Sequence, residues 1–330
     1  MTDGYSFSSS STATLSRTSP NEGTSLHYLV ETGPHTVDIV EAEAPRLDDG
    51  HVRVTVAHVG VCHSDTARVA AARGPFPARI GHEVSGIVTE SRSDDIEVGA
   101  RVVAYVVDGY ATELVVPRNR IVPLHPDCDL VDAALAEPLA CVIGGVEMLD
   151  LAHVPHVVLV GAGFMGLLTL RLLVAGGHRV IVIEPRDAGR ERATEWGAEV
   201  VLHPDDARAY FPDGAPVVIE ATGAAAGLEL AGDLTELEGT LGIMGFHQSG
   251  GGVRTVPMEG WNYKALRVLN LHHRDPENVM RWIDRAQRLS AHGVVRPSLL
   301  VDGRVTFDQL PAVFADPREY GAFKTVLDVD

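Results

Sequence analysis

Two short segments of the sequence combine side chains that bind zinc. Cys62-His63-Ser64-Asp65 follows an apolar run, and Gly81-His82-Glu83 comes further along the chain. A thiolate, an imidazole and carboxylates form the mixed ligand set that suits Zn²⁺ in a catalytic site with an open position. Taken alone, Cys62 could be a buried apolar residue and His82 a hydrogen-bonded surface histidine. Their occurrence together favours a metal site.

A glycine-rich segment predicts a nicotinamide dinucleotide site. Gly161-Ala162-Gly163-Phe164-Met165-Gly166 follows the apolar run 156–160 and opens a helical pattern over 167–174. In a βα turn, Gly161 would permit the tight bend, Gly163 would let the pyrophosphate approach, and Gly166 would let the helix pack on the strand. The amides at the start of the helix attract phosphates. The alternative is a glycine-rich turn that binds no dinucleotide.

The residues after the next apolar run bear on the choice between NAD and NADP. Glu184 ends the run 180–183, where a carboxylate would accept hydrogen bonds from the adenosine ribose and repel a 2′-phosphate. We therefore expect NAD(H) to be preferred. Arg186 could attract a 2′-phosphate, so NADP(H) is not excluded.

The elements that must position these residues change in character along the chain. Between residues 25 and 137 the apolar runs are short and broken by Gly and Pro, which is typical of a β-rich domain. Later runs, such as 156–160 and 215–220, are nearly continuous and alternate with helical stretches. That alternation predicts βαβ units and an α/β fold with a doubly wound parallel sheet.

The sequence divides into three expected parts. Residues 1–24 are rich in Ser and Thr and are expected to form a disordered tail. The β-rich domain would comprise residues 25–143 and 275–330, and the parallel-sheet domain residues 144–274. In the last segment we expect a helix near 279–292, and β-like runs that return to the first domain at 297–301 and 323–329.

The composition excludes several classes of partner. The 330 residues include 45 acidic and 27 basic side chains, and the net charge of -18 repels nucleic acid. We find no apolar run of the length that a secretory signal or a membrane span requires. The three cysteines, Cys62, Cys128 and Cys141, are too few for a disulfide framework, so a cytoplasmic location is expected.

Seven motifs give the chain a resemblance to a known family. It resembles the medium-chain dehydrogenases/reductases of the zinc-dependent alcohol dehydrogenase superfamily and is similar to their polyol branch, which includes sorbitol and threonine dehydrogenases. The resemblance implies a GroES-like catalytic domain and a Rossmann domain. The motifs are GVCHSD (60–65), GHEVSG (81–86), GARV (99–102), GYATELVVP (109–117), EPLA (137–140), GAGFMG (161–166) and EATG (220–223).

The resemblance also implies a ligand set for one catalytic zinc. Cys62 and His82 would bind the metal directly, and Glu83 would be a ligand or an exchangeable ligand. Glu137 would bind zinc directly or through water. The alcohol dehydrogenase branch has a cysteine at the position of Glu137, so Cys141, four residues later, is an alternative ligand.

Further roles follow from the same likeness. His63 and Thr222 would contact the cofactor, and Asp65 would orient His82. Ser64 would take a proton from the bound alcohol, which makes Ser64, Cys62 and His82 the expected catalytic residues.

The sequence departs from the family in two places. Many relatives carry a four-cysteine lobe for a structural zinc between the equivalents of GARV and GYATE, but here only residues 103–108 separate these motifs and none is cysteine. A structural zinc is therefore not expected. The histidine that relays the proton in some relatives would fall at Ala67, so the acceptor beyond Ser64 is open.

Together these features predict hydride transfer between NAD(P) and a secondary alcohol of the polyol, sugar, cyclitol or aminocyclitol class. The alternatives are a ketone or double-bond reductase, a zinc lyase or isomerase that retains a nicotinamide, and a non-catalytic binding protein. Segments 259–264 and 270–274 are candidates for cofactor or substrate contact. We expect a homodimer or homotetramer through an edge strand near 239–246.

Overall fold

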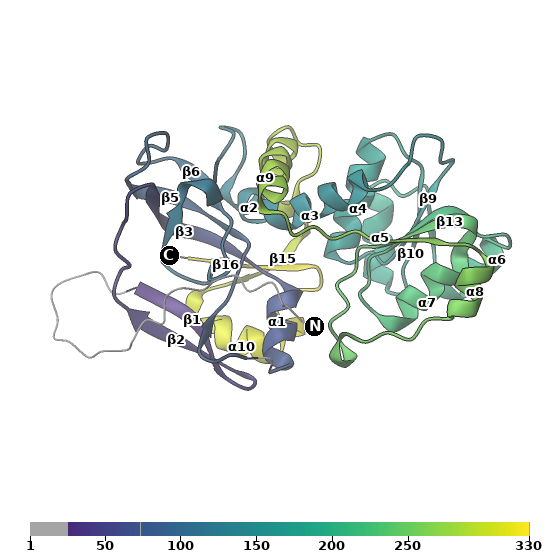
Figure 1. Ribbon diagram of the computed structural model, residues 1–330, viewed down its shortest axis with the longest axis horizontal. Coiled ribbons are helices and arrows are strands. Elements are labelled where there is room, and N and C mark those ends of the chain that lie inside the picture. Colours follow the sequence, from purple (N-terminus) through teal and green to yellow (C-terminus); the bar gives the residue numbers. More distant parts are fainter. Residues whose placement is uncertain (1–25, 73, 330) are drawn as a thin grey trace.

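The computed structural model describes residues 26–72 and 74–329, which form two bodies side by side (Figure 1). The first body holds a sheet of order β15-β16-β3-β5-β6-β8, with β7 paired to β3, and a smaller sheet of order β2-β1-β4. Their bounds are β1 Leu26–Gly33, β2 Thr36–Ala42, β3 His51–Val61, β4 Ala78–Arg79, β5 Val84–Ser91, β6 Arg101–Ala104, β7 Glu113–Pro117, β8 Ile121–Pro123, β15 Val301–Val305 and β16 Lys324–Asp328.

The end of the chain contributes two strands to the larger sheet. β16 runs antiparallel to β3, with Val326 opposite Gly60, and β15 runs parallel to β16. The prediction of a β-like run at 297–301 was wrong for its first four residues. Pro297–Leu300 forms a 3-10 helix, and the strand starts at Val301. A proline cannot donate to a strand ladder but fits the first position of a helical turn.

The second body contains a six-stranded parallel sheet of order β11-β10-β9-β12-β13-β14. The strands are β9 Val157–Val160, β10 Val180–Ile183, β11 Val200–Leu202, β12 Ala215–Glu220, β13 Thr235–Ile243 and β14 Arg267–Asn270. All four residues of β9 are buried, as expected for a strand covered on both faces. This order is that of a doubly wound dinucleotide-binding sheet, so the predicted fold class is confirmed.

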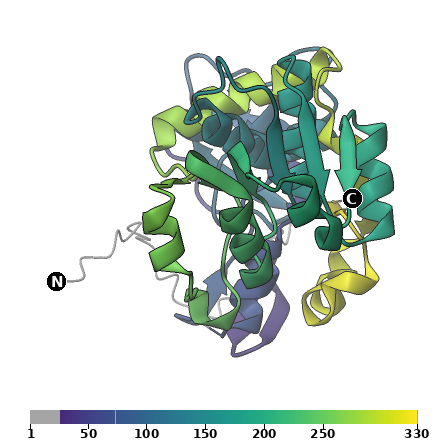
Figure 2. The same ribbon diagram turned by 90° about the vertical axis from the view of Figure 1, so that its right-hand side faces the viewer.

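Helices surround this sheet, as the end-on view in Figure 2 shows. They are α4 Phe164–Ala175, α5 Asp187–Glu195, α6 Pro204–Tyr210, α7 Ala225–Leu234 and α8 Met258–Tyr263. Three other helices, α2 Leu130–Ala134, α3 Ala136–Glu147 and α9 Pro276–Ala291, lie between the two bodies in Figure 1. The first body also carries α1 His63–Ala70 and α10 Leu310–Ala315.

The predicted domain boundary between residues 143 and 144 falls inside the continuous helix α3. Buried residues of α3 and α9, such as Leu139 and Ile283, share one apolar core with Leu159 of the parallel sheet. The division into domains therefore stays a prediction, with α3 linking the two bodies.

The strand expected at the edge of the parallel sheet lies inside it. β13 pairs with β12 on one side and β14 on the other, so the edge at this end is β14. The prediction that residues 239–246 form an edge strand was wrong, because β14, the next strand along the chain, pairs with the outer side of β13. Dimer or tetramer formation stays a prediction. In the described part of the chain, no helix has both the length and the apolar composition that a membrane span needs.

Candidate active site

Strand pairing brings the two metal-binding segments together. Cys62 follows β3 and caps the N-terminus of α1, where its Sγ accepts hydrogen bonds from Ser64 N at 3.4 Å and Ser64 Oγ at 3.1 Å. His82 and Glu83 directly precede β5, the antiparallel partner of β3. A hydrogen bond of 2.9 Å from Gly60 N to Glu83 O fixes the register at this point. The ends of the two segments therefore face each other.

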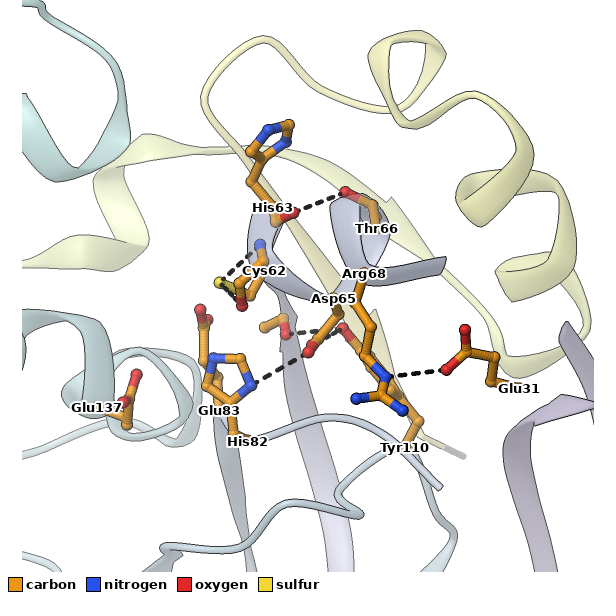
Figure 3. Close-up of polar contacts among 12 residues, drawn as sticks. Glu31, Cys62, His63, Asp65, Thr66, Arg68, His82, Glu83, Tyr110 and Glu137 are labelled. Carbon is orange, nitrogen blue, oxygen red and sulfur yellow. Dashed lines mark hydrogen bonds and ion pairs between the residues drawn. The ribbon is translucent and has the colours of Figure 1, made fainter. Parts of the chain in front are cut away.

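The side chains of Cys62, His82 and Glu83 form one compact group of donors (Figure 3). One ligand atom from each residue lies within 4.8 Å of the others. A sulfur, an imidazole nitrogen and a carboxylate oxygen at this spacing fit Zn²⁺ with a fourth position left for water or substrate. Three of the four ligands predicted from the sequence are thus brought together.

Glu137, the fourth predicted ligand, lies outside this group. It stands in the first turn of α3, and Cys141 Sγ donates to its Oε1 at 3.5 Å. Burial raises the pKa of Glu137, and the charge of Glu83 adds to this effect while that of His82 opposes it. The influence of those charges indicates that Glu137 is near the donor group, but it is not among the residues whose ligand atoms lie within 4.8 Å of one another. Cys141, the alternative ligand, is also outside the group.

Asp65 and Tyr110 hold the imidazole of His82. Asp65 Oδ1 lies 3.3 Å from His82 Nδ1, and Tyr110 Oη donates to Asp65 Oδ2 at 3.1 Å. This contact places the proton on Nδ1 and leaves Nε2 available for a metal. Burial alone would lower the pKa of His82, but the charge of Cys62 and the hydrogen bond that His82 donates to Asp65 raise it well above its usual value. The site thus attracts positive charge.

Lys324 is a site residue that the sequence analysis missed. From β16 its Nζ reaches 2.7 Å from both carboxylate oxygens of Glu83, although only the contact to Oε1 has hydrogen-bond geometry. The ammonium also lies 4.7 Å from the ring centroid of Phe164, in the glycine-rich turn. Burial disfavours the charge on Lys324, but Glu83 and Cys62 raise its pKa. The only sequence signal was a lysine within an apolar run.

A missing side chain at Gly60 makes room for Glu83. A Cβ built there would lie 1.9 Å from Glu83 Oε2, so any larger residue would displace this carboxylate. The fit of the donor group therefore depends on a glycine in the neighbouring strand.

The glycine-rich turn has the geometry of a dinucleotide-binding turn. Gly161 has a φ of 104°, and a Cβ there would lie 2.6 Å from Thr222 Cγ2. A Cβ at Gly166 would lie 2.1 Å from Gly161 O, so this glycine lets α4 pack on the turn. At Gly163, the N-cap of α4, the nearest atom would be Arg186 Nη2 at 4.0 Å. The space that a pyrophosphate needs is therefore open at Gly163.

The carboxylate of Glu184 is held by groups of the protein. It accepts hydrogen bonds from Ala162 N at 2.7 Å, from Arg186 N at 2.9 Å and from Arg186 Nε at 2.8 Å. Burial raises the pKa of Glu184, but the hydrogen bonds from Arg186 and Ala162 lower it overall. The carboxylate is therefore charged, and Arg186 lies beside the position predicted for the adenosine ribose.

The other predicted cofactor residues have different environments. The exposed ring of His63 points away from the donor group (Figure 3). Phe164 and Met165 form the first turn of α4. Thr222 donates through its amide and hydroxyl to Glu220, beside Gly161. In the segment 259–264, Lys264 Nζ donates to the carbonyls of Asp233 and Thr235, which is a structural role.

Comparison with known proteins places this site in a family. Residues 48–126 match the alcohol dehydrogenase GroES-like domain, and residues 165–287 match the family described as zinc-binding dehydrogenase. D-xylulose reductase A of Aspergillus oryzae is 25% identical over 359 residues, with 93% of this chain and 98% of that protein covered. The 2-dehydro-3-deoxy-L-galactonate 5-dehydrogenase of Pseudoalteromonas atlantica is 26% identical over 256 residues, with 66% of this chain and 75% of that protein covered.

Solved structures share the fold. A putative zinc-binding dehydrogenase from Sinorhizobium meliloti bound to NADP superimposes with a TM-score of 0.82 at 24% identity, and 92% of this chain and 99% of that chain are covered. The donor group, the glycine-rich turn and both family matches thus agree. The chain belongs to the zinc-dependent alcohol dehydrogenase superfamily and is an NAD(P)-linked dehydrogenase.

Proposed function

We propose that this enzyme transfers a hydride between NAD(H) and a secondary alcohol on a polyol, sugar, cyclitol or aminocyclitol, with one catalytic zinc and no structural zinc. The observation that carries the proposal is the group formed by Cys62, His82 and Glu83, with ligand atoms within 4.8 Å of one another. Relatives named for xylulose and for a deoxygalactonate support the carbohydrate class.

The side chains of this site have distinct roles in the proposal. Zinc, when bound, lowers the pKa of an alcohol oxygen and polarises a carbonyl. Asp65 lies 3.3 Å from His82 Nδ1, which supports a role in orienting the imidazole so that Nε2 is free to bind the metal. Ser64, whose hydroxyl donates to Cys62 Sγ at 3.1 Å, is proposed to relay the alcohol proton, which it accepts as its own hydroxyl proton leaves to water.

Other residues hold and orient the cofactor. The amides at the start of α4 and the space beside Gly163 suit the pyrophosphate. Lys324 joins the two halves of the site, because its ammonium contacts Glu83 and lies over Phe164 of the turn. NAD(H) is the preferred cofactor in the proposal because Glu184 is charged, and NADP(H) is the alternative that Arg186 would favour.

The test combines metal analysis with a substrate screen. Purified protein is assayed for zinc and for reduced nicotinamide absorbance with a panel of polyols and both cofactors. We expect Cys62→Ala and His82→Ala to lose zinc and turnover together, and Glu137→Gln to retain zinc because Glu137 lies outside the donor group. Cys128→Ala is the matched control, because Cys128 is buried and its Sγ donates to Asp129 O. Full turnover in a metal-free variant would refute the proposal.

A further inference from the structure

The segment after β14 packs against the helix that borders the metal site. His273 Nε2 lies 3.0 Å from Gly144 O, and a Cβ at Gly145 would lie 2.9 Å from Leu271 O. These two glycines of α3 follow Glu137 and Cys141 at helical spacing, so all four share one side of the helix. The residue after His273 therefore lies beside the same helix as Glu137.

That residue, Arg274, presents an unpaired positive charge. Its guanidinium carbon lies 6.0 Å from the ring centroid of Phe246, which is 52% exposed, and Nη1 donates to His273 O. Among the described residues, no carboxylate forms an ion pair with Arg274. The adjacent Asp275 is engaged as the N-cap of α9, where it accepts from two backbone amides.

A second unpaired guanidinium comes from the other body of the molecule. Arg120 ends the short 3-10 helix after β7, and its guanidinium carbon lies 5.1 Å from the ring centroid of Tyr105. No acidic partner of Arg120 is found in the described ranges. By contrast, the nearby Arg118 pairs with Asp95. Arg120 and Arg274 thus differ from Arg118 in that neither has an acidic partner among the described residues.

Tyr105 links these two arginines to the metal site. It follows β6 directly and is half-buried. Burial raises the pKa of Tyr105, the charges of Glu137 and Cys141 add to the rise, and those of Arg120 and Arg274 oppose it. The ring of Tyr105 is therefore in contact with Arg120 at 5.1 Å and within electrostatic range of Arg274 and of Glu137 and Cys141 on α3.

We propose that Arg120 and Arg274, one from each body of the molecule, bind an anionic group on the alcohol substrate, either a carboxylate or a phosphate. This inference rests on the proposed function and specifies its substrate class. Guanidinium groups match the oxygens of both anions in geometry and charge. The protein has a net charge of -18 and carboxylates at its metal site, and both repel an anion. An anionic substrate therefore needs a local positive charge such as that of the two arginines.

The experiment measures binding by isothermal titration calorimetry, independently of turnover. The full chain is loaded with zinc and saturating NADH, so that the phosphate site of the cofactor turn is filled. The probes are D-sorbitol, D-gluconate and D-sorbitol 6-phosphate, which share a six-carbon polyol chain and differ in charge. The proteins are the wild type, Arg120→Met, Arg274→Met and the control Arg208→Met, whose arginine pairs with Asp233 on α7.

We expect gluconate or sorbitol 6-phosphate to bind the wild type at least about tenfold more tightly than sorbitol, and the anion that shows the larger gain identifies the group. Each of the two variants should lose about 10- to 100-fold for that anion, whereas Arg208→Met keeps the preference. Equal binding of all three compounds to the wild type overturns the inference, as does a preference that survives in both variants. Absence of polyol turnover, with the anion preference intact, would instead count against the proposed function.

Discussion

Lys324 Nζ lies 2.7 Å from the carboxylate of Glu83, and the two side chains are 5% and 1% exposed. These residues are far apart in the sequence, yet β16 and β5 flank β3 in one sheet and bring them together. The pair neutralises a carboxylate that would otherwise be buried with its charge uncompensated. It also connects the metal-binding group to the cofactor turn through the ring of Phe164.

Removal of this ammonium should destabilise the metal-free protein. We expect Lys324→Met to lower the free energy of unfolding by about 3–5 kcal/mol, because Glu83 then keeps an unpaired buried charge. Urea unfolding of the metal-free protein measures this change. The double variant Glu83→Gln/Lys324→Met should recover much of the loss, and zinc should recover part of it in the single variant. If the double variant lost as much free energy of unfolding as the two single variants together, this account would be contradicted.

The contact between Asp65 and His82 should control zinc affinity. Asp65→Asn keeps the shape of the side chain but removes its charge, which weakens the hold on His82 Nδ1 at 3.3 Å. We expect zinc affinity to fall by about 10- to 100-fold, as measured by competition with a chelator. Tyr110→Phe, which keeps the Asp65 charge but removes the hydrogen bonds from Tyr110 Oη to Asp65 Oδ2 and Gly60 O, serves as the milder comparison. Unchanged affinity in Asp65→Asn would show that the orientation of His82 does not depend on Asp65.

Arg186 should shift the choice of cofactor. Its guanidinium binds Glu184 at 2.8 Å and lies beside the space left open at Gly163. We expect Arg186→Ala to reduce kcat/KM for NADP about tenfold or more while the value for NAD falls less, because Glu184 is then free to accept from the ribose. Initial rates with both cofactors give this ratio. Arg304→Ala, which removes a surface pair with Asp328, controls for the loss of an arginine. A fall of equal size for both cofactors would exclude Arg186 from cofactor discrimination.

Local patterns in the sequence predicted much of the fold. The apolar run before Cys62 forms β3 in the domain expected to be β-rich, and the helix expected near 279–292 is α9, Pro276–Ala291. The run 156–160, Gly161 and the helix after it form the predicted strand, turn and helix, because spacing within a few residues determines such units. The donor group could also be predicted from two short segments of the sequence, because Cys62 lies in one and the neighbouring residues His82 and Glu83 lie in the other.

The features that the sequence analysis missed depend on contacts between distant segments. Nothing near Lys324 in the sequence indicates that its partner is Glu83, because the pairing follows from the order of strands in the sheet. The position of β13 inside its sheet depends in the same way on where β14 adds. The involvement of Arg186 with Glu184 depends on a side-chain conformation that periodicity does not encode.

The late position of β16 in the chain has a consequence for biosynthesis. The nascent polypeptide exposes Cys62, His82 and Glu83 long before Lys324 has left the ribosome. Until then Glu83 lacks its counter-ion, and the first sheet lacks the strand that pairs with β3 along Gly60 and Val61. A fragment released before this strand would therefore present an open, acidic metal-binding surface and would be a ready substrate for cellular proteases.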